Sequence, residues 1–171
     1  MNCNISSASR SFHPAILPTF KKEEKKPVIL IEKIKNKDGE VYATLSYEPN
    51  KNYLLMQWLG YCSEDEVKYA SLKMLEWQRK EGQFKQCRFH VHDTKEIEGA
   101  WIGLVDWINN EFFPLNYQVG LRYNISIISP DLFSKMSSLA LKQQKNTIVP
   151  TVLFDTLRQA EQWLIEKYRQ L

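Results

Sequence analysis

One stretch, residues 99–129, constrains the fold most, because it combines a helix, a break and a buried strand in a single short run. Its first half carries an apolar stripe at helical spacing, made of Trp101, Leu104, Val105, Ile108 and Phe112. We predict that Pro114 interrupts this helix, that Gly120 stops the next turn, and that 123–129 forms a short strand. The stretch contains no nucleophile paired with a base and no phosphate-binding glycine loop, so it predicts architecture rather than chemistry.

The size and charge of the chain narrow its class. At 171 residues, one domain with its own core is the default. Residues 1–26 hold five Lys and Arg against two Glu, which leaves 18 basic and 18 acidic residues in the remainder. That balance predicts no nucleic-acid partner, and no apolar run is long enough to span a membrane. Three widely spaced cysteines favour a reducing, cytoplasmic location without disulfides.

The first third of the chain predicts an antiparallel meander. We interpret residues 1–26 as an irregular or disordered lead-in and residues 27–171 as the folded domain. Three strands are then expected, at 28–34, 41–47 and 53–59, joined by an Asp38-Gly39 turn and by the 48–52 segment.

Helical spacing begins after this meander. Ser63 and Glu66 match the capping box, so a helix should start there, and Gly82 offers a left-handed stop. Residues 87–92 are expected to form the next strand, which ends at Asp93 before the helix that starts at Gly99.

The last third repeats the alternation of strand and helix. Ser129 is expected to cap a helix in which Ser134, Ser137 and Ser138 are ordinary surface residues. Residues 151–154 should form the final strand, and Asp155 should cap the final helix. Strands that alternate with helices imply parallel pairing, so we predict an α/β fold with a mixed β-sheet, antiparallel at its N-terminal meander and parallel beyond it.

The order of these elements resembles the SpoIIAA-like branch of the STAS superfamily, whose members include STAS/SEC14-like proteins. The resemblance covers about residues 40–168 and is carried by Trp58-Leu59-Gly60, Asp93, Gly99-Ala100-Trp101, Asp106-Trp107, Phe113-Pro114, Gly120-Leu121, Ser129-Pro130-Asp131, Phe154-Asp155, Ala160 and Trp163-Leu164. It implies helices largely on one face of the sheet and a role in binding or regulation rather than catalysis. SEC14-like relatives further imply a pocket for a lipid or another hydrophobic ligand between sheet and helices.

The chain differs from the anti-sigma-factor antagonists of this superfamily in the segment 93–99. Those proteins carry an Asp-Ser-Ser-Gly type of motif in which a kinase modifies the serine. Here the segment holds Thr94 and no serine, and its glutamates would repel a phosphate. This argues against partner switching by phosphorylation and leaves Thr94 as the one conceivable acceptor.

Two further groups of residues could carry catalytic or metal chemistry. His90 and His92 share one strand face and Asp93 follows, which is compatible with a metal-dependent hydrolase, although the alternative is two polar residues on a partly exposed sheet face. Cys62 precedes a helix, where the dipole could activate a thiolate, but no base is predicted beside it. Neither arrangement supplies a complete catalytic set, so we expect no enzyme activity, no cofactor and no metal.

Our leading hypothesis is a cytoplasmic, non-enzymatic domain that binds a protein partner or a small apolar ligand. A homodimer is also compatible with the sequence. Ligands favour the carboxyl ends of parallel strands, so the site is expected in the loops around 93–101 and 129–133. Trp101 should head the buried stripe, whereas Trp107 points away from it toward another element, chain or ligand. The candidate interaction residues are Asp93, Thr94, Gly99, Trp101, Trp107, Ser129 and Phe133.

Overall fold

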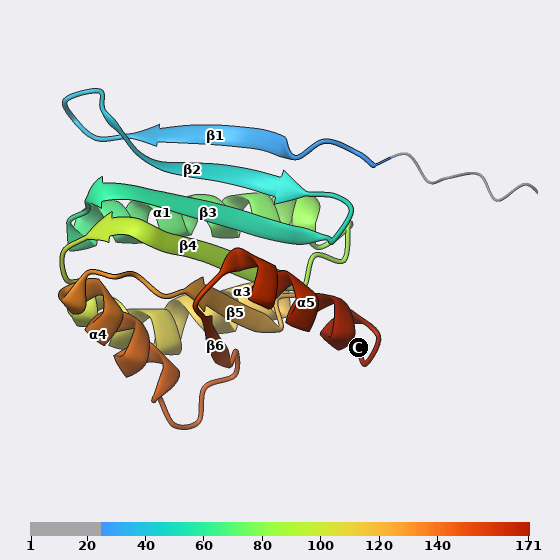
Figure 1. Cartoon of the computed structure of the whole chain (residues 1–171). Coiled ribbons are helices and arrows are strands. Elements are labelled where there is room, and N and C mark those ends of the chain that lie inside the picture. The colour runs from blue at the N-terminus through green and yellow to red at the C-terminus, as the bar shows by residue number, and fades with distance from the viewer. Residues whose placement is uncertain (1–24) are drawn as a thin grey trace, which may run out of the picture.

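The computed structural model describes residues 25–171, and its centre is a six-stranded sheet (Figure 1). The strands are β1 (Ile29–Lys35), β2 (Val41–Glu48), β3 (Tyr53–Tyr61), β4 (Phe89–Glu98), β5 (Tyr123–Ile127) and β6 (Thr151–Phe154). They lie side by side in chain order, antiparallel from β1 to β3 and parallel from β3 to β6. The predicted α/β fold with a mixed sheet is therefore confirmed. The predicted lead-in lies outside the described residues, apart from Lys25 and Lys26.

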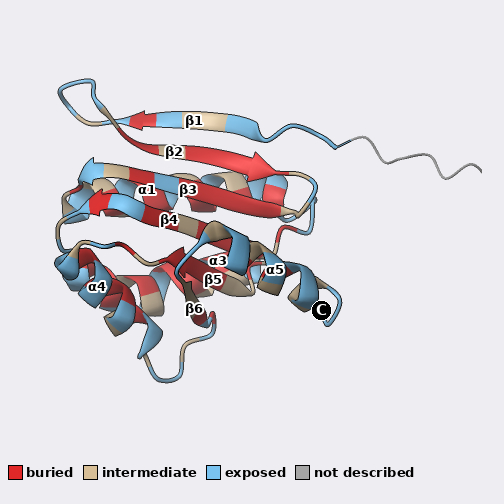
Figure 2. Cartoon of the chain, in the orientation of Figure 1, coloured by how far each residue is buried: buried red, intermediate tan, exposed pale blue. Residues whose placement is uncertain are grey.

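Helices cover both faces of this sheet. They are α1 (Glu64–Trp77) with the π-helical turn η1 (Gln78–Gly82), the run η2 (Ile102–Leu104), α2 (Val105–Trp107), η3 (Ile108–Phe112) and α3 (Phe113–Gln118), then α4 (Leu132–Lys142) and α5 (Leu157–Tyr168). Right-handed crossovers between parallel strands in sequential order put the connecting helices on one face. Residues of α1, the η2–α3 run and α4 share one large core with that face, and α5 packs on the other (Figure 2).

The structure confirms the first helix start and corrects its end. Ser63 and Glu66 form the predicted capping box. Gly82, however, is not left-handed, because the helix continues through η1 and the positive φ, +54°, occurs at Gln86. Glycine is needed at position 82 for close packing instead, because a Cβ there would collide with Oε1 of Gln78. The Gln78 side chain is itself held in place, since its buried amide donates to the Cys87 carbonyl at 2.7 Å.

The predicted end of the fourth strand at Asp93 is wrong. Strand β4 runs on to Glu98 because the long strand β3 pairs with it as far as Tyr61. The turn comes at Gly99, whose φ of +95° suits a residue without a Cβ, and helical structure starts only at Ile102. The segment 93–98, expected as a loop, is therefore part of the sheet.

Pro114 does not break the helical run. It lies in the first turn of α3, directly after the π-helical turn η3, in which the amide of Phe113 donates to the Ile108 carbonyl five residues back. The wider turn accommodates the missing N–H of proline without ending the helix. The apolar stripe from Trp101 to Phe112 is buried as predicted, and Gly120 ends the run with a φ of +110°.

Two predicted helix caps are displaced along the chain. The cap of α4 is Asp131, which accepts from the amide of Ser134 at 2.9 Å, while the Ser129 hydroxyl donates to the Ile97 carbonyl at 3.2 Å. Thr156 caps α5 in place of Asp155. In both cases the predicted residue belongs to the loop that precedes the helix.

Helix α4 is turned opposite to the expected orientation. Ser134, Ser137 and Ser138 are buried, so their interpretation as surface residues is wrong, and large apolar residues face outward. The Ser137 hydroxyl explains part of this orientation. Its oxygen accepts a hydrogen bond from the Trp101 amide at 3.1 Å, and the hydroxyl donates to the Phe133 carbonyl at 3.0 Å. Small side chains also let α4 approach the domain closely.

We expect Ser137→Ala to destabilise the protein and Ser138→Ala not to. Ser137→Ala leaves the buried Trp101 amide without an acceptor and should lower the free energy of unfolding by about 1–3 kcal/mol. The Ser138 hydroxyl is buried without a partner among the described residues, so its removal should be neutral or stabilising. Chemical denaturation of both variants measures the difference, and an equal loss in both would contradict it.

Candidate functional site

Polar side chains line up on the sheet face beneath α1, α3 and α4. Trp58 comes from β3, His92 from β4, Asn124 from β5 and Thr151 from β6. The Trp58 indole donates to Nδ1 of His92 at 3.3 Å, and the Asn124 amide donates to the Thr151 hydroxyl at 3.2 Å, while the Asn124 side chain lies beside the His92 ring. These four side chains, which we call the polar row, connect four neighbouring strands.

The polar row fixes the protonation of His92. The indole can only donate, so Nδ1 of His92 must accept and the ring proton sits on Nε2. The Asn124 amide donates to Thr151. His92 keeps an intermediate exposure where it lines the cavity, and the loss of solvent around the rest of the ring lowers its pKa to about 4. At neutral pH the row carries no charge.

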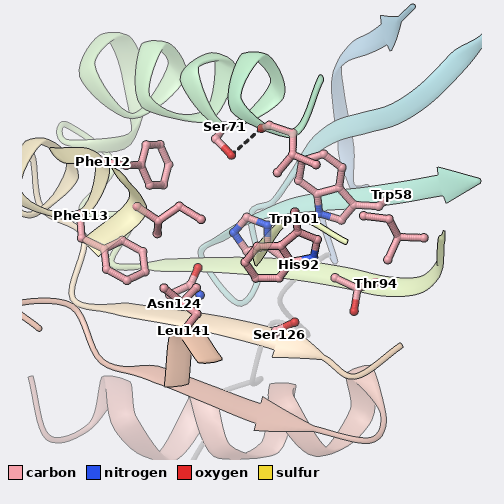
Figure 3. A pocket seen from close by; sticks show the side chains of 13 residues that line it. Trp58, Ser71, His92, Thr94, Trp101, Phe112, Phe113, Asn124, Ser126 and Leu141 are labelled. Atoms are coloured by element: carbon pink, nitrogen blue, oxygen red, sulfur yellow. Dashed lines mark hydrogen bonds between the residues drawn. The ribbon is translucent and has the colours of Figure 1, made fainter. Parts of the chain in front are cut away.

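A cavity opens above the polar row, with a water-accessible volume of about 40 Å³ (Figure 3). Its lining comes from the sheet, from α1, from the η2–α3 run and from α4, and none of it is charged. The apolar and aromatic part of the lining consists of Trp58, Val67, Ile97, Trp101, Ile108, Phe112, Phe113 and Leu141. The polar part consists of Ser71, His92, Thr94, Asn124 and Ser126.

Ser126 differs from the other hydroxyls of the cavity. The Ser71 hydroxyl donates to the Val67 carbonyl of its own helix at 2.8 Å, and the Thr94 hydroxyl donates to the Ile127 carbonyl. The Ser126 hydroxyl is buried and has no hydrogen-bond partner within residues 25–171. Buried polar atoms are almost always paired, so this group calls for a partner inside the cavity.

His90 does not join the cavity. Its Nε2 lies 3.4 Å from Oε1 of Gln78, and burial lowers its pKa well below the usual range. His90 is fully buried, which contradicts the interpretation of a partly exposed face at that residue, whereas His92 has an intermediate exposure. Among residues 25–171, no three His, Cys, Asp or Glu side chains gather where they could hold a metal.

The cysteines of the described region are also unsuited to nucleophilic chemistry. Cys62 and Cys87 are buried and unbridged, and burial raises the pKa of each thiol to about 12. The helix start next to Cys62 therefore does not activate it, because loss of solvent outweighs the dipole. Cys3 lies outside the described residues.

The predicted interaction residues separate in space. Thr94 and Trp101 line the cavity. Asp93 lies on the opposite face of β4, where its carboxylate is 3.5 Å from Nζ of Lys95. Trp107 is half-buried against Phe112, with their ring centroids 5.5 Å apart, and does not line the cavity.

The other three predicted residues have structural or surface positions. Gly99 turns the chain after β4, and a Cβ there would meet the Tyr61 ring at 2.9 Å. Ser129 ties its loop to β4 through Ile97, and Phe133 lies exposed on α4.

The sequence hypotheses did not include Trp58, Asn124 or Ser126 as site residues. A signal for two of them is present: Asn124 and Ser126 are polar at alternate positions of a strand whose other residues are apolar. In a parallel strand that must be buried on both faces, such an alternation indicates a polar interior rather than an exposed face.

Comparisons of this chain with family models, with curated proteins and with solved structures find no match. The site is therefore argued from its own geometry.

Stability should fall as the pH drops from 6.5 toward 4. The unfolded chain binds a proton at His92 below about pH 6.5, whereas the folded chain does so only near pH 4. The folded state therefore loses about 2 kcal/mol between pH 6.5 and pH 5 through His92. Urea denaturation at pH 7 and pH 5 measures this loss.

The matched variant is His92→Asn, which keeps an acceptor near the Trp58 indole but does not titrate. The difference between its free energies of unfolding at pH 7 and pH 5 should be smaller by about 2 kcal/mol than in the original chain. An unchanged pH difference would show that His92 is solvated rather than buried.

Proposed function

We propose that this protein is a non-enzymatic binding domain that holds a small, uncharged and partly apolar ligand in the cavity above the polar row. The observation that carries the proposal is the unpartnered hydroxyl of Ser126, which is buried in a cavity otherwise lined by paired polar groups and aromatic rings. Cavities of this kind bind molecules that fill the apolar space and complete the missing hydrogen bond.

The lining defines the chemistry of the ligand. No charged side chain faces the cavity and His92 is neutral, so an ionic group would enter without a counter-charge. Trp58, Trp101 and Phe112 offer aromatic surface suited to a flat or aliphatic molecule. One hydroxyl or carbonyl group on the ligand could bond the Ser126 hydroxyl, which both donates and accepts.

The size of the cavity weighs against the lipid carrier suggested by SEC14-like relatives. About 40 Å³ of water-accessible volume is roughly the space of a few water molecules, far below what an acyl chain occupies. A metal-dependent hydrolase is also disfavoured, because Nδ1 of His92 accepts from the Trp58 indole and no three possible metal ligands gather among residues 25–171. The resemblance to the SpoIIAA-like branch of the STAS superfamily supports a binding role, and we carry it forward as part of the proposal.

Native mass spectrometry of the purified protein tests this function. We expect a fraction of the protein to carry a small added mass that disappears on denaturation. Ser126→Ala should reduce that fraction by about tenfold, since one hydrogen bond in a buried site contributes about 1–1.5 kcal/mol.

Ser71→Ala is the matched control, because this serine also lines the cavity but its hydroxyl is already paired with its own helix. It should leave the added mass in place. The proposal would be overturned if the original chain carried no added mass and its melting temperature did not respond to small neutral alcohols such as ethanol and propan-2-ol.

A further inference from the structure

The outward face of α4 is an apolar surface without a partner among the described residues. Leu132 is 63% exposed, Phe133 61%, Met136 50% and Leu139 36%. Positions 132, 136 and 139 follow helical spacing, so these side chains form one stripe, which we call the α4 apolar face. Four large apolar residues on an 11-residue helix are far more than scattered surface hydrophobics.

This face is also cationic. Lys135, Lys142 and Lys145 are exposed along and just beyond α4, and residues 132–154 contain no Asp or Glu. Ile102, half exposed in the adjoining turn η2, extends the apolar area, since η2 packs against α4. The surface therefore offers apolar side chains and positive charge together, and Asp131 is the one acidic residue of α4 and its N-cap.

We propose that the α4 apolar face binds an anionic lipid surface. Leu132 and Phe133, at the first turn of α4, enter the boundary between headgroups and acyl chains, and the lysines contact lipid phosphates. This is the pattern of a helix that lies in a membrane interface, with aromatic and aliphatic residues on the lipid side and lysine stems reaching outward. No helix of residues 25–171 is long and apolar enough to cross a bilayer, so attachment through α4 is peripheral.

A second copy of the chain is a poorer occupant. Two copies related by twofold symmetry would place the same patch against itself. Lys135 and Lys142 of both copies would then meet with no carboxylate available from 132–154, and burial of unpaired like charges is unfavourable. An anionic surface removes this conflict, because every lysine gains a partner.

The physical basis predicts weak, salt-sensitive attachment. One short helix inserts only a few side chains, so the apolar contribution alone is marginal and the lysines must add to it. Lysines near an anionic leaflet are attracted to it, and salt screens that attraction. The inference does not depend on the ligand in the cavity.

Vesicle flotation with the full chain tests the proposal. We expect binding to vesicles of phosphatidylcholine mixed with phosphatidylserine and little binding to phosphatidylcholine alone. The double variant Leu132→Ser with Phe133→Ser should bind the mixed vesicles at least about tenfold more weakly. Lys135→Gln with Lys142→Gln should weaken binding about tenfold and remove most of the preference for the anionic vesicles.

Phe84→Ser is the matched control. Phe84 is 79% exposed in the loop after η1, more exposed than Phe133, but it lies off the α4 apolar face. Its substitution should leave vesicle binding unchanged. Because all substituted side chains are exposed, thermal unfolding should stay close to that of the original chain in every variant.

Three results would overturn the proposal. The first is an original chain that floats with neither kind of vesicle at low salt. The second is equal loss of binding in Phe84→Ser and in the double α4 variant, which would indicate nonspecific adsorption. The third is a dimer in solution that Leu132→Ser with Phe133→Ser dissociates, because the face would then be an interface between copies of this chain.

Discussion

The polar row is the interaction on which the rest of this structure depends. It places an indole, an imidazole, an amide and a hydroxyl inside a sheet face that helices cover, where each unpaired group would cost free energy. The pairing holds only if the strands keep their register, since a shift by one residue would turn His92 toward α5. It also requires a neutral His92, and burial secures this by lowering its pKa. Register, tautomer and cavity floor therefore follow from these two hydrogen bonds between neighbouring strands.

Local signals predicted much of the fold. The capping box at Ser63 and the stripe headed by Trp101 depend on neighbours within a few residues, and both occur as expected. The prediction failed in two places. Strand β4 passes Asp93 because β3, a partner distant in sequence, continues beside it. The helical run passes Pro114 because η3 widens the turn directly before it, and apolar periodicity does not distinguish a π-helical turn from an α-helical one.

The site was harder to predict than the fold for a related reason. Polar residues such as His92 and Asn124 predict an exposed face when only one strand is considered, and the covering helices are a tertiary fact. Helix α4 shows the same problem in reverse. Its amphipathic pattern alone favours burial of Phe133, but the serine face packs inward, where the Ser137 hydroxyl accepts a hydrogen bond from the Trp101 amide. That buried amide needs an acceptor, which accounts for part of the orientation of α4.

Helix α4 joins the two surfaces for which functions are proposed. On its inner side, Leu141 lines the cavity, and Ser137 holds the backbone of Trp101, another cavity residue. The same Ser137 hydroxyl donates to the carbonyl of Phe133, whose side chain belongs to the α4 apolar face on the outer side of the helix. Ser134 and Ser138 add buried hydroxyls without partners among the described residues, which weakens the packing of α4 by their desolvation cost. A molecule that packs against Trp101 and Leu141 adds contacts to α4, the helix whose inner face carries these unpaired hydroxyls. Filling the cavity should therefore rigidify the same helix that presents the apolar face, because both contacts act on one element.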